Sequence, residues 1–155
     1  MKKKTTRIVI ISGENEFVCK LFDRSFLIKN KKNFSIVSFI SSFNGIENVK
    51  KIFKNTDVYS FRDFEKTNIS IFKNPKNEID KNVLEKNYDI ESLSYNFLNY
   101  ANPGHYNFSL RELKQAYYNA LNFSLNFLDY YKPNCVICTD VPHSFQTFIF
   151  TRLCE

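Results

Sequence analysis

The sequence predicts an α/β fold in which short apolar strands and amphipathic helices alternate around a mostly parallel sheet. Two observations support this prediction. A strand-like run, a helical pattern and a second strand-like run follow one another over residues 7–41, and such a unit forms a parallel pair with a right-handed crossover. The 155 residues, 43% of them hydrophobic, are enough for a single domain spanning residues 1–155.

The first strand and helix are the clearest part of this pattern. Residues 7–12 (RIVIIS) form a continuous apolar run that ends at a glycine, as expected of a strand buried on both faces. Residues 14–30 follow with apolar side chains at helical spacings, among them Phe17 and Leu21, and with acids in the first turn, where the helix dipole favours them. Residues 34–41 (FSIVSFIS) are expected to form the second strand.

The middle of the chain has weaker patterns. Residues 46–54 have a helical period, and residues 58–61 are predicted as a short third strand. Residues 65–87 are polar and rich in Lys and Asn, which indicates a long connecting segment within the domain and not a linker between domains. A helix is expected over residues 89–99, with a stop at residues 102–104 (NPG).

The C-terminal third returns to regular patterns. Ser109 and Glu112 predict a capping box at the start of a long amphipathic helix over residues 110–131. A buried strand is expected over residues 134–139, and a helix over residues 145–155. Together the elements predict a Rossmann-like three-layer fold.

The four cysteines do not predict a metal site. Cys135 and Cys138 have the spacing of a redox or zinc motif, but on a strand residues three apart project to opposite faces. We therefore interpret them as core thiols, and Cys19 and Cys154 add no further ligand pattern. The absence of a secreted disulfide pattern favours a cytoplasmic protein.

The net charge of +6 favours anionic partners without naming one. Lysines cluster at residues 2–4 and 29–32, and the other charges are interleaved with acids, so we interpret them as a dispersed, solvated surface. Nucleic-acid binding is a weaker alternative, because no recognised motif is present. The apolar run at residues 7–12 is too short for a signal peptide or a membrane span, although peripheral contact with a membrane stays open.

Polar residues after the first strand form one candidate site. In open parallel sheets, ligands bind beyond the carboxyl ends of the strands. Ser12, Gly13 and Asn15 occupy this position and are candidate substrate-binding residues. One glycine is not the G-x-G-x-x-G fingerprint, so a plain strand-to-helix turn remains the alternative.

A second candidate site follows the strand at residues 134–139. Asp140, His143 and Ser144 place an acid, an imidazole and a hydroxyl just before a helix. His143 is the candidate catalytic residue, because a neutral imidazole near a helix N-terminus suits a general base, while Asp140 and Ser144 are candidate substrate-binding residues. The alternative is that Asp140 or Ser144 only caps the helix and His143 is a structural partner. His105, in a turn-rich loop, is a secondary substrate-binding candidate.

Residues 113–155 resemble the N-terminal region of bacterial capsular and surface-polysaccharide biosynthesis proteins. The resemblance rests on a helix containing a Tyr-Tyr pair, on the run YKPNCVI at residues 131–137, on Pro142-His143 and on the closing RLCE at residues 152–155. In that group the helix ends in Lys-Pro-Asp, a hydrophobic strand follows, and a Pro-His pair opens the next helix. The chain departs from the pattern at Asn134, which replaces the Asp, and at Thr147, where an acid is expected.

This resemblance implies the acceptor-side half of a GT-B-like glycosyltransferase, an enzyme built from two Rossmann-like halves. The chain would bind a sugar acceptor, and the other half would bind most of a nucleotide-sugar donor, with no further cofactor. This chain would then be inactive alone. The alternative is a stand-alone, non-catalytic flavodoxin-like module that binds a protein partner or a small anionic ligand.

Overall fold

The computed structural model describes residues 5–12, 29–30, 32–41, 46–65, 109–139 and 144–154. The elements, in chain order, are β1 (Thr6–Ser12), β2 (Phe34–Ser41), α3 (Ile46–Ile52), β3 (Asp57–Ser60), the 3₁₀ helix η2 (Phe61–Glu65), α6 (Leu110–Tyr131), β4 (Cys135–Cys138) and α7 (Phe145–Arg152). The chain divides into two compact units. We call Met1–Arg62 with Tyr131–Val141 the sheet unit, and Asp63–Tyr130 with Pro142–Glu155 the helical unit.

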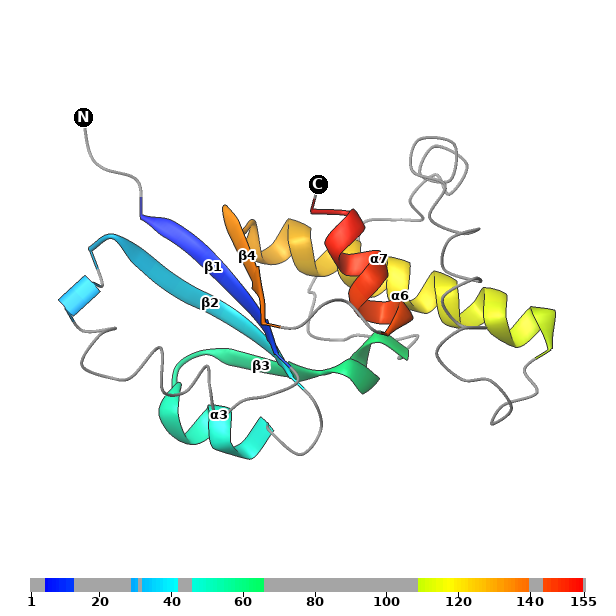
Figure 1. Cartoon of the computed structure of the whole chain (residues 1–155), viewed down its shortest axis with the longest axis horizontal. Coiled ribbons are helices and arrows are strands. Elements are labelled where there is room, and N and C mark those ends of the chain that lie inside the picture. Colours follow the sequence, from blue (N-terminus) through cyan, green and yellow to red (C-terminus); the bar gives the residue numbers. More distant parts are fainter. Residues whose placement is uncertain are drawn as a thin grey trace. The chain divides into compact units, whose positions relative to one another are not determined.

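The sheet unit contains a four-stranded parallel sheet in the order β3-β2-β1-β4 (Figure 1). The predicted parallel pairing of the first two strands is confirmed, with Thr6 opposite Phe34 and Ser12 opposite Ser41. The protein therefore has the α/β, Rossmann-like fold that the sequence predicts. The predicted helix at residues 14–30 lies almost entirely outside the described residues, as do residues 66–108.

One face of the sheet packs against α3. Ile8 and Ile10 of β1 and Phe39 of β2 form a buried cluster with Val49 and Phe53 from α3 and the turn that follows it. The rings of Phe39 and Phe53 lie 5.6 Å apart. Burying side chains of this size stabilises the fold by about 1.5–3 kcal/mol each, so this cluster holds α3 on the sheet.

The prediction that β4 is a strand is confirmed, but the prediction that it is buried was wrong. All four residues of β4 are only partly buried. The physical reason is that β4 is an edge strand of the described sheet and pairs with β1 alone. Cys135 packs beside the α3 cluster, and Cys138 faces the other way. Within the described residues, no group of His, Cys, Asp or Glu side chains is arranged to hold a metal ion.

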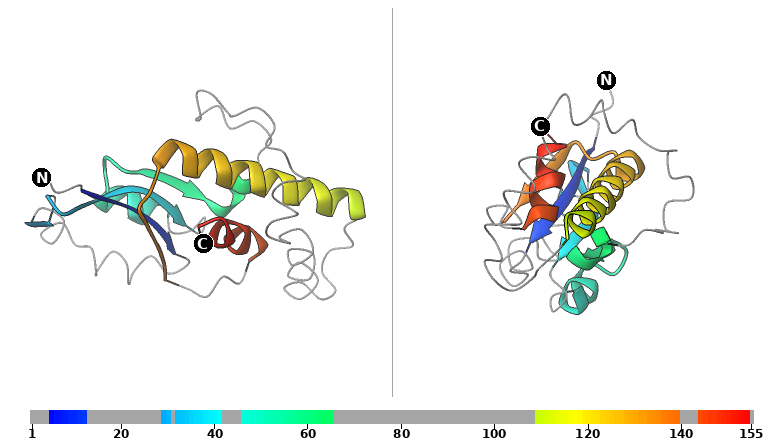
Figure 2. Two further views of the ribbon diagram at one scale, coloured as in Figure 1. Left: turned by 90° about the horizontal axis from the view of Figure 1, so that it is seen from above. Right: turned by 90° about the vertical axis from the view of Figure 1, so that its right-hand side faces the viewer.

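The long helix α6 has the predicted bounds and the predicted cap. It is the long yellow-to-orange helix in Figure 2. The backbone N–H and the hydroxyl of Ser109 each donate to the Glu112 carboxylate at 2.7 Å, and the Glu112 N–H donates back to the Ser109 hydroxyl at 3.3 Å. These hydrogen bonds lower the pKa of Glu112. The capping box thus defines where α6 begins.

Four phenylalanines form the core of the helical unit. They come from η2, α6 and α7, and all are fully buried: Phe64, Phe123, Phe127 and Phe150. The rings of Phe64 and Phe123 lie 4.3 Å apart, and Phe127 meets Phe150 edge to face at 5.4 Å. These four rings are therefore core, and none of them is available to stack on a ligand.

The start of α7 is capped by a second capping box. The Ser144 hydroxyl accepts a hydrogen bond from the Thr147 N–H, and the Thr147 side chain interacts in return with the Ser144 backbone. Thr147 therefore performs the structural role that an acid usually has at this position. Among the described helices, none is both long and apolar enough to cross a bilayer.

Candidate functional site

The carboxyl ends of the four strands carry a row of hydroxyl side chains. Ser12 of β1 lies opposite Ser41 of β2, and Ser41 lies opposite Ser60 of β3. On the other side of β1, Thr139 follows Cys138, which lies opposite Ile11. We call Ser60, Ser41, Ser12 and Thr139 the hydroxyl row. Because neighbouring residues in register share a face of a parallel sheet, these side chains project to the same side.

Two members of the hydroxyl row are joined by a direct hydrogen bond. The Thr139 hydroxyl donates to the Ser12 hydroxyl at 2.8 Å, and the Thr139 N–H donates to the Ile11 carbonyl at 3.0 Å. This contact joins the carboxyl ends of β1 and β4. In the strand order β3-β2-β1-β4, the chain adds β2 and then β3 on one side of β1, and it later adds β4 on the other side of β1. The carboxyl ends of β1 and β4 thus mark the topological switch point, and ligands of open α/β sheets bind beyond the strand ends at such a point.

The hydroxyl row is mostly covered. Ser12 and Ser41 are 0% exposed and Ser60 is 6% exposed, whereas Thr139 is only partly buried. Ser12, a predicted substrate-binding residue, is fully buried and accepts the hydrogen bond from Thr139. Thr139 is the most exposed member of the row. Sequence reasoning missed Thr139, although its place one residue after a strand paired with β1 would have indicated it.

The predicted site residues divide into two groups. Ser12 lies at the switch point, and Ser144 belongs to the helical unit, where its hydroxyl caps α7. The remaining candidates lie outside the described residues: Gly13, Asn15, His105, Asp140 and His143. Asp140 directly follows Thr139 in the chain.

A second polar cluster in the sheet unit surrounds Tyr131, the last residue of α6. Its hydroxyl donates to the Asp57 carboxylate at 2.6 Å and lies 2.6 Å from the Tyr59 hydroxyl. Burial, followed by the hydrogen bonds to Asp57 and Tyr59, raises the pKa of Tyr131. Tyr59 and Tyr131 are 3% and 4% exposed, so this cluster is a structural anchor with little room for a ligand.

The backbone carbonyl of Tyr131 is also hydrogen-bonded. The Arg7 guanidinium donates two hydrogen bonds to the Tyr131 carbonyl, at 2.8 and 2.6 Å. The next residue, Lys132, has a φ of 43°, the left-handed conformation that commonly ends a helix. Asn134 then pairs with the Arg7 backbone through its side-chain oxygen and its N–H. Asn134 therefore acts in chain pairing at the start of β4.

Comparisons with protein-family models, with curated proteins and with solved structures found no match to this chain.

Proposed function

We propose that this chain is the acceptor-side domain of a glycosyltransferase-like protein of surface or capsular polysaccharide biosynthesis. Its sugar ligand would bind beyond the carboxyl ends of β1 and β4. The observation that carries the placement is the bonded pair Ser12 and Thr139 at the switch point of a parallel sheet. The glycosyltransferase assignment itself comes from the sequence resemblance.

The chemistry of the hydroxyl row supports a sugar ligand. Ser and Thr hydroxyls both donate and accept, which matches the hydroxyl groups of a sugar. The Thr139 hydroxyl donates to Ser12 and belongs to a residue that is partly exposed. A hydroxyl-bearing acceptor therefore matches the hydrogen-bonding chemistry of Thr139.

His143 is the proposed general base. In this mechanism, the imidazole takes the proton of an acceptor hydroxyl as that oxygen attacks the anomeric carbon of a nucleotide-sugar donor. The bond from that carbon to the donor's diphosphate breaks, and groups on the other half of the enzyme stabilise the departing diphosphate. Asp140 follows Thr139 in the chain and is proposed to contact the acceptor.

The alternative of a flavodoxin-like module has less support. Flavodoxin-like sheets place the third strand beside the first, in the order 2-1-3. The described strands instead have the order 3-2-1-4, which is that of the first four strands of a dinucleotide-binding fold.

Ligand-observed NMR tests the proposal on the purified chain. Saturation transfer is measured to the methyl glycosides of glucose, galactose and N-acetylglucosamine, and to UDP-glucose. We expect transfer to at least one glycoside, and we expect Thr139→Val, which removes the hydroxyl but keeps the shape, to reduce it at least fivefold, the effect of about 1 kcal/mol for one hydrogen bond.

Ser35→Ala is the matched control, because Ser35 is an exposed hydroxyl near the other end of the sheet. Its signal should equal that of the wild type. Absence of transfer to every glycoside would overturn the sugar assignment, and an equal loss in both variants would remove the ligand from the switch point.

A further inference from the structure

Positive charge is concentrated in the sheet unit. Among the described residues, the sheet unit has eight Lys or Arg residues and two acids, whereas the helical unit has three Lys or Arg residues and four acids. The sequence alone predicts a dispersed charge. The difference arises because lysines that are far apart in the sequence belong to one compact unit.

These lysines gather where the strands begin. Lys32 comes two residues before β2, Lys54 three before β3, and Lys132 three before β4. Since all four strands are parallel, their amino ends lie together at one end of the sheet, which we call the amino edge, and their carboxyl ends lie at the opposite end, the carboxyl edge. With strands about 4.8 Å apart, the amino edge is roughly 15 Å wide.

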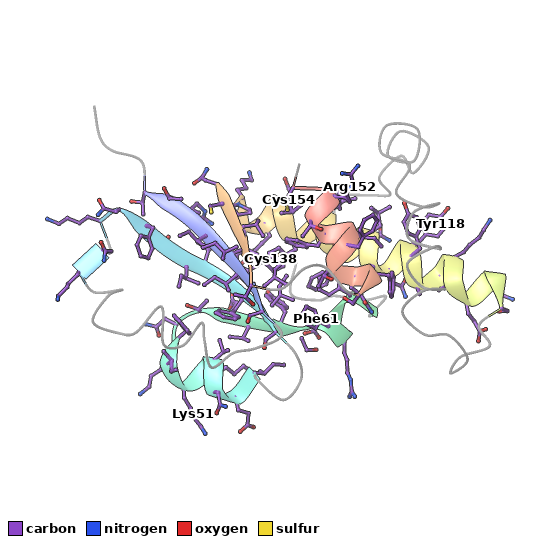
Figure 3. All side chains as sticks on the ribbon, in the orientation of Figure 1. Lys51, Phe61, Tyr118, Cys138, Arg152 and Cys154 are labelled. Carbon is purple, nitrogen blue, oxygen red and sulfur yellow. The ribbon has the colours of Figure 1, made fainter. Side chains whose placement is uncertain are left out.

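The helix α3 adds two more lysines to the same edge. It connects the carboxyl end of β2 to the amino end of β3, so its last turn, with Lys50 and Lys51, approaches the amino edge. The Lys51 side chain extends from α3 away from the sheet (Figure 3). We call Lys32, Lys50, Lys51, Lys54 and Lys132 the lysine edge. All five residues are exposed.

Acidic side chains do not balance the lysine edge within the described part of the sheet unit. Of its two acids, Asp57 accepts a hydrogen bond from Tyr131, and Glu47 lies in the first turn of α3, at the other end of that helix. Favourable interaction with a helix dipole explains lysines in a last turn, but it does not explain Lys32, which precedes a strand. The edge is thus a positively charged surface roughly as wide as the sheet.

We propose that the lysine edge docks on a membrane surface rich in anionic lipid headgroups. Two observations favour this partner over nucleic acid. Ile52, between Lys51 and Lys54, is 38% exposed, and an apolar side chain among lysines can enter the headgroup region. The described residues of the sheet unit include no exposed aromatic side chain on which a base could stack. The carboxyl-edge ligand site lies at the opposite end of the strands, so this inference does not depend on the proposed function.

Vesicle cosedimentation of the full chain tests the docking. The wild type is expected to bind vesicles of phosphatidylcholine and phosphatidylglycerol in equal parts, but not pure phosphatidylcholine vesicles. Each lysine near an anionic surface changes the partition coefficient about fivefold, so Lys51→Gln with Lys54→Gln should weaken binding more than tenfold. Binding should also fall as salt is raised.

The control removes two positive charges from the helical unit, by Arg111→Gln with Lys114→Gln, both of which are exposed. Circular dichroism checks that each variant folds. A control loss as large as that of the Lys51 and Lys54 pair would overturn the proposal, because net charge alone would then explain binding. Equal binding to both kinds of vesicle, or release from anionic vesicles by an equal charge of single-stranded DNA, would also overturn it.

Discussion

The two edges of the parallel sheet differ in almost every physical property. The carboxyl edge has the hydroxyl row, which is neutral, small and largely buried. The amino edge has five exposed lysines and the anchor formed by Tyr131, Asp57 and Arg7. Both edges belong to the same sheet unit, so the contrast arises within one compact body.

This contrast follows from parallel topology. When all strands run in one direction, the residues that precede them meet at one edge and the residues that follow them meet at the other. Small hydroxyls at the strand ends let loops and ligands approach closely, whereas long lysine side chains keep their charge in water. The small buried hydroxyls and the exposed lysines therefore lie at opposite ends of the strands.

The largest expected change in stability comes from removing the Tyr131 anchor at the amino edge. Tyr131→Phe removes the hydroxyl that donates to Asp57 and contacts Tyr59, so it should lower the free energy of unfolding by about 1–3 kcal/mol. Urea denaturation measures this change. Tyr130→Phe is the control, because Tyr130 is 52% exposed and should change stability by less than about 0.5 kcal/mol. Equal stabilities of the two variants would contradict the anchor.

Alkaline pH should weaken the same anchor. The folded-state pKa of Tyr131 is raised, so the unfolded chain ionises this residue near pH 10 while the folded chain keeps its proton. The stabilisation is complete below about pH 10 and is lost as the pH rises above it, by about 1.4 kcal/mol per pH unit. Urea titrations above pH 10 should therefore show wild-type stability falling faster than that of Tyr131→Phe. Parallel pH profiles would exclude this linkage.

At the carboxyl edge, the expected effect is smaller. Ser12→Ala removes the acceptor of the Thr139 hydroxyl and should cost about 1 kcal/mol of unfolding free energy. Ser35→Ala, near the amino edge, removes an exposed hydroxyl and should be close to neutral. Thermal denaturation of the pair measures the difference. If Ser35→Ala proved the more destabilising, the two ends of the sheet would not differ as described.

The smallest effect is expected at the lysine edge. Lys32→Gln removes an exposed charge and should change the free energy of unfolding by less than about 0.5 kcal/mol. Its effect on binding to anionic vesicles should be several-fold, measured by the cosedimentation described above. A large loss of stability would show that the lysine is part of the fold and not only of its surface.

Local sequence patterns alone predicted most of the described elements closely. The second strand and the long helix were predicted with their observed bounds, because a short run of strand-forming residues, a 3.6-residue period and a capping box are visible without any tertiary contact. The prediction for Ser12 was correct in placing it at the carboxyl end of β1. Its hydrogen bond with Thr139 joins residues that are 127 positions apart in the chain.

Pairing between distant segments could be learned only from the folded chain. The partial exposure of β4 depends on the strand order, which cannot be inferred from the apolar sequence of β4 itself. The Tyr131 anchor and the lysine edge likewise join residues from separate parts of the sequence. Side-chain periodicity is a local property, whereas strand order, burial and the meeting of charges arise when the sheet assembles.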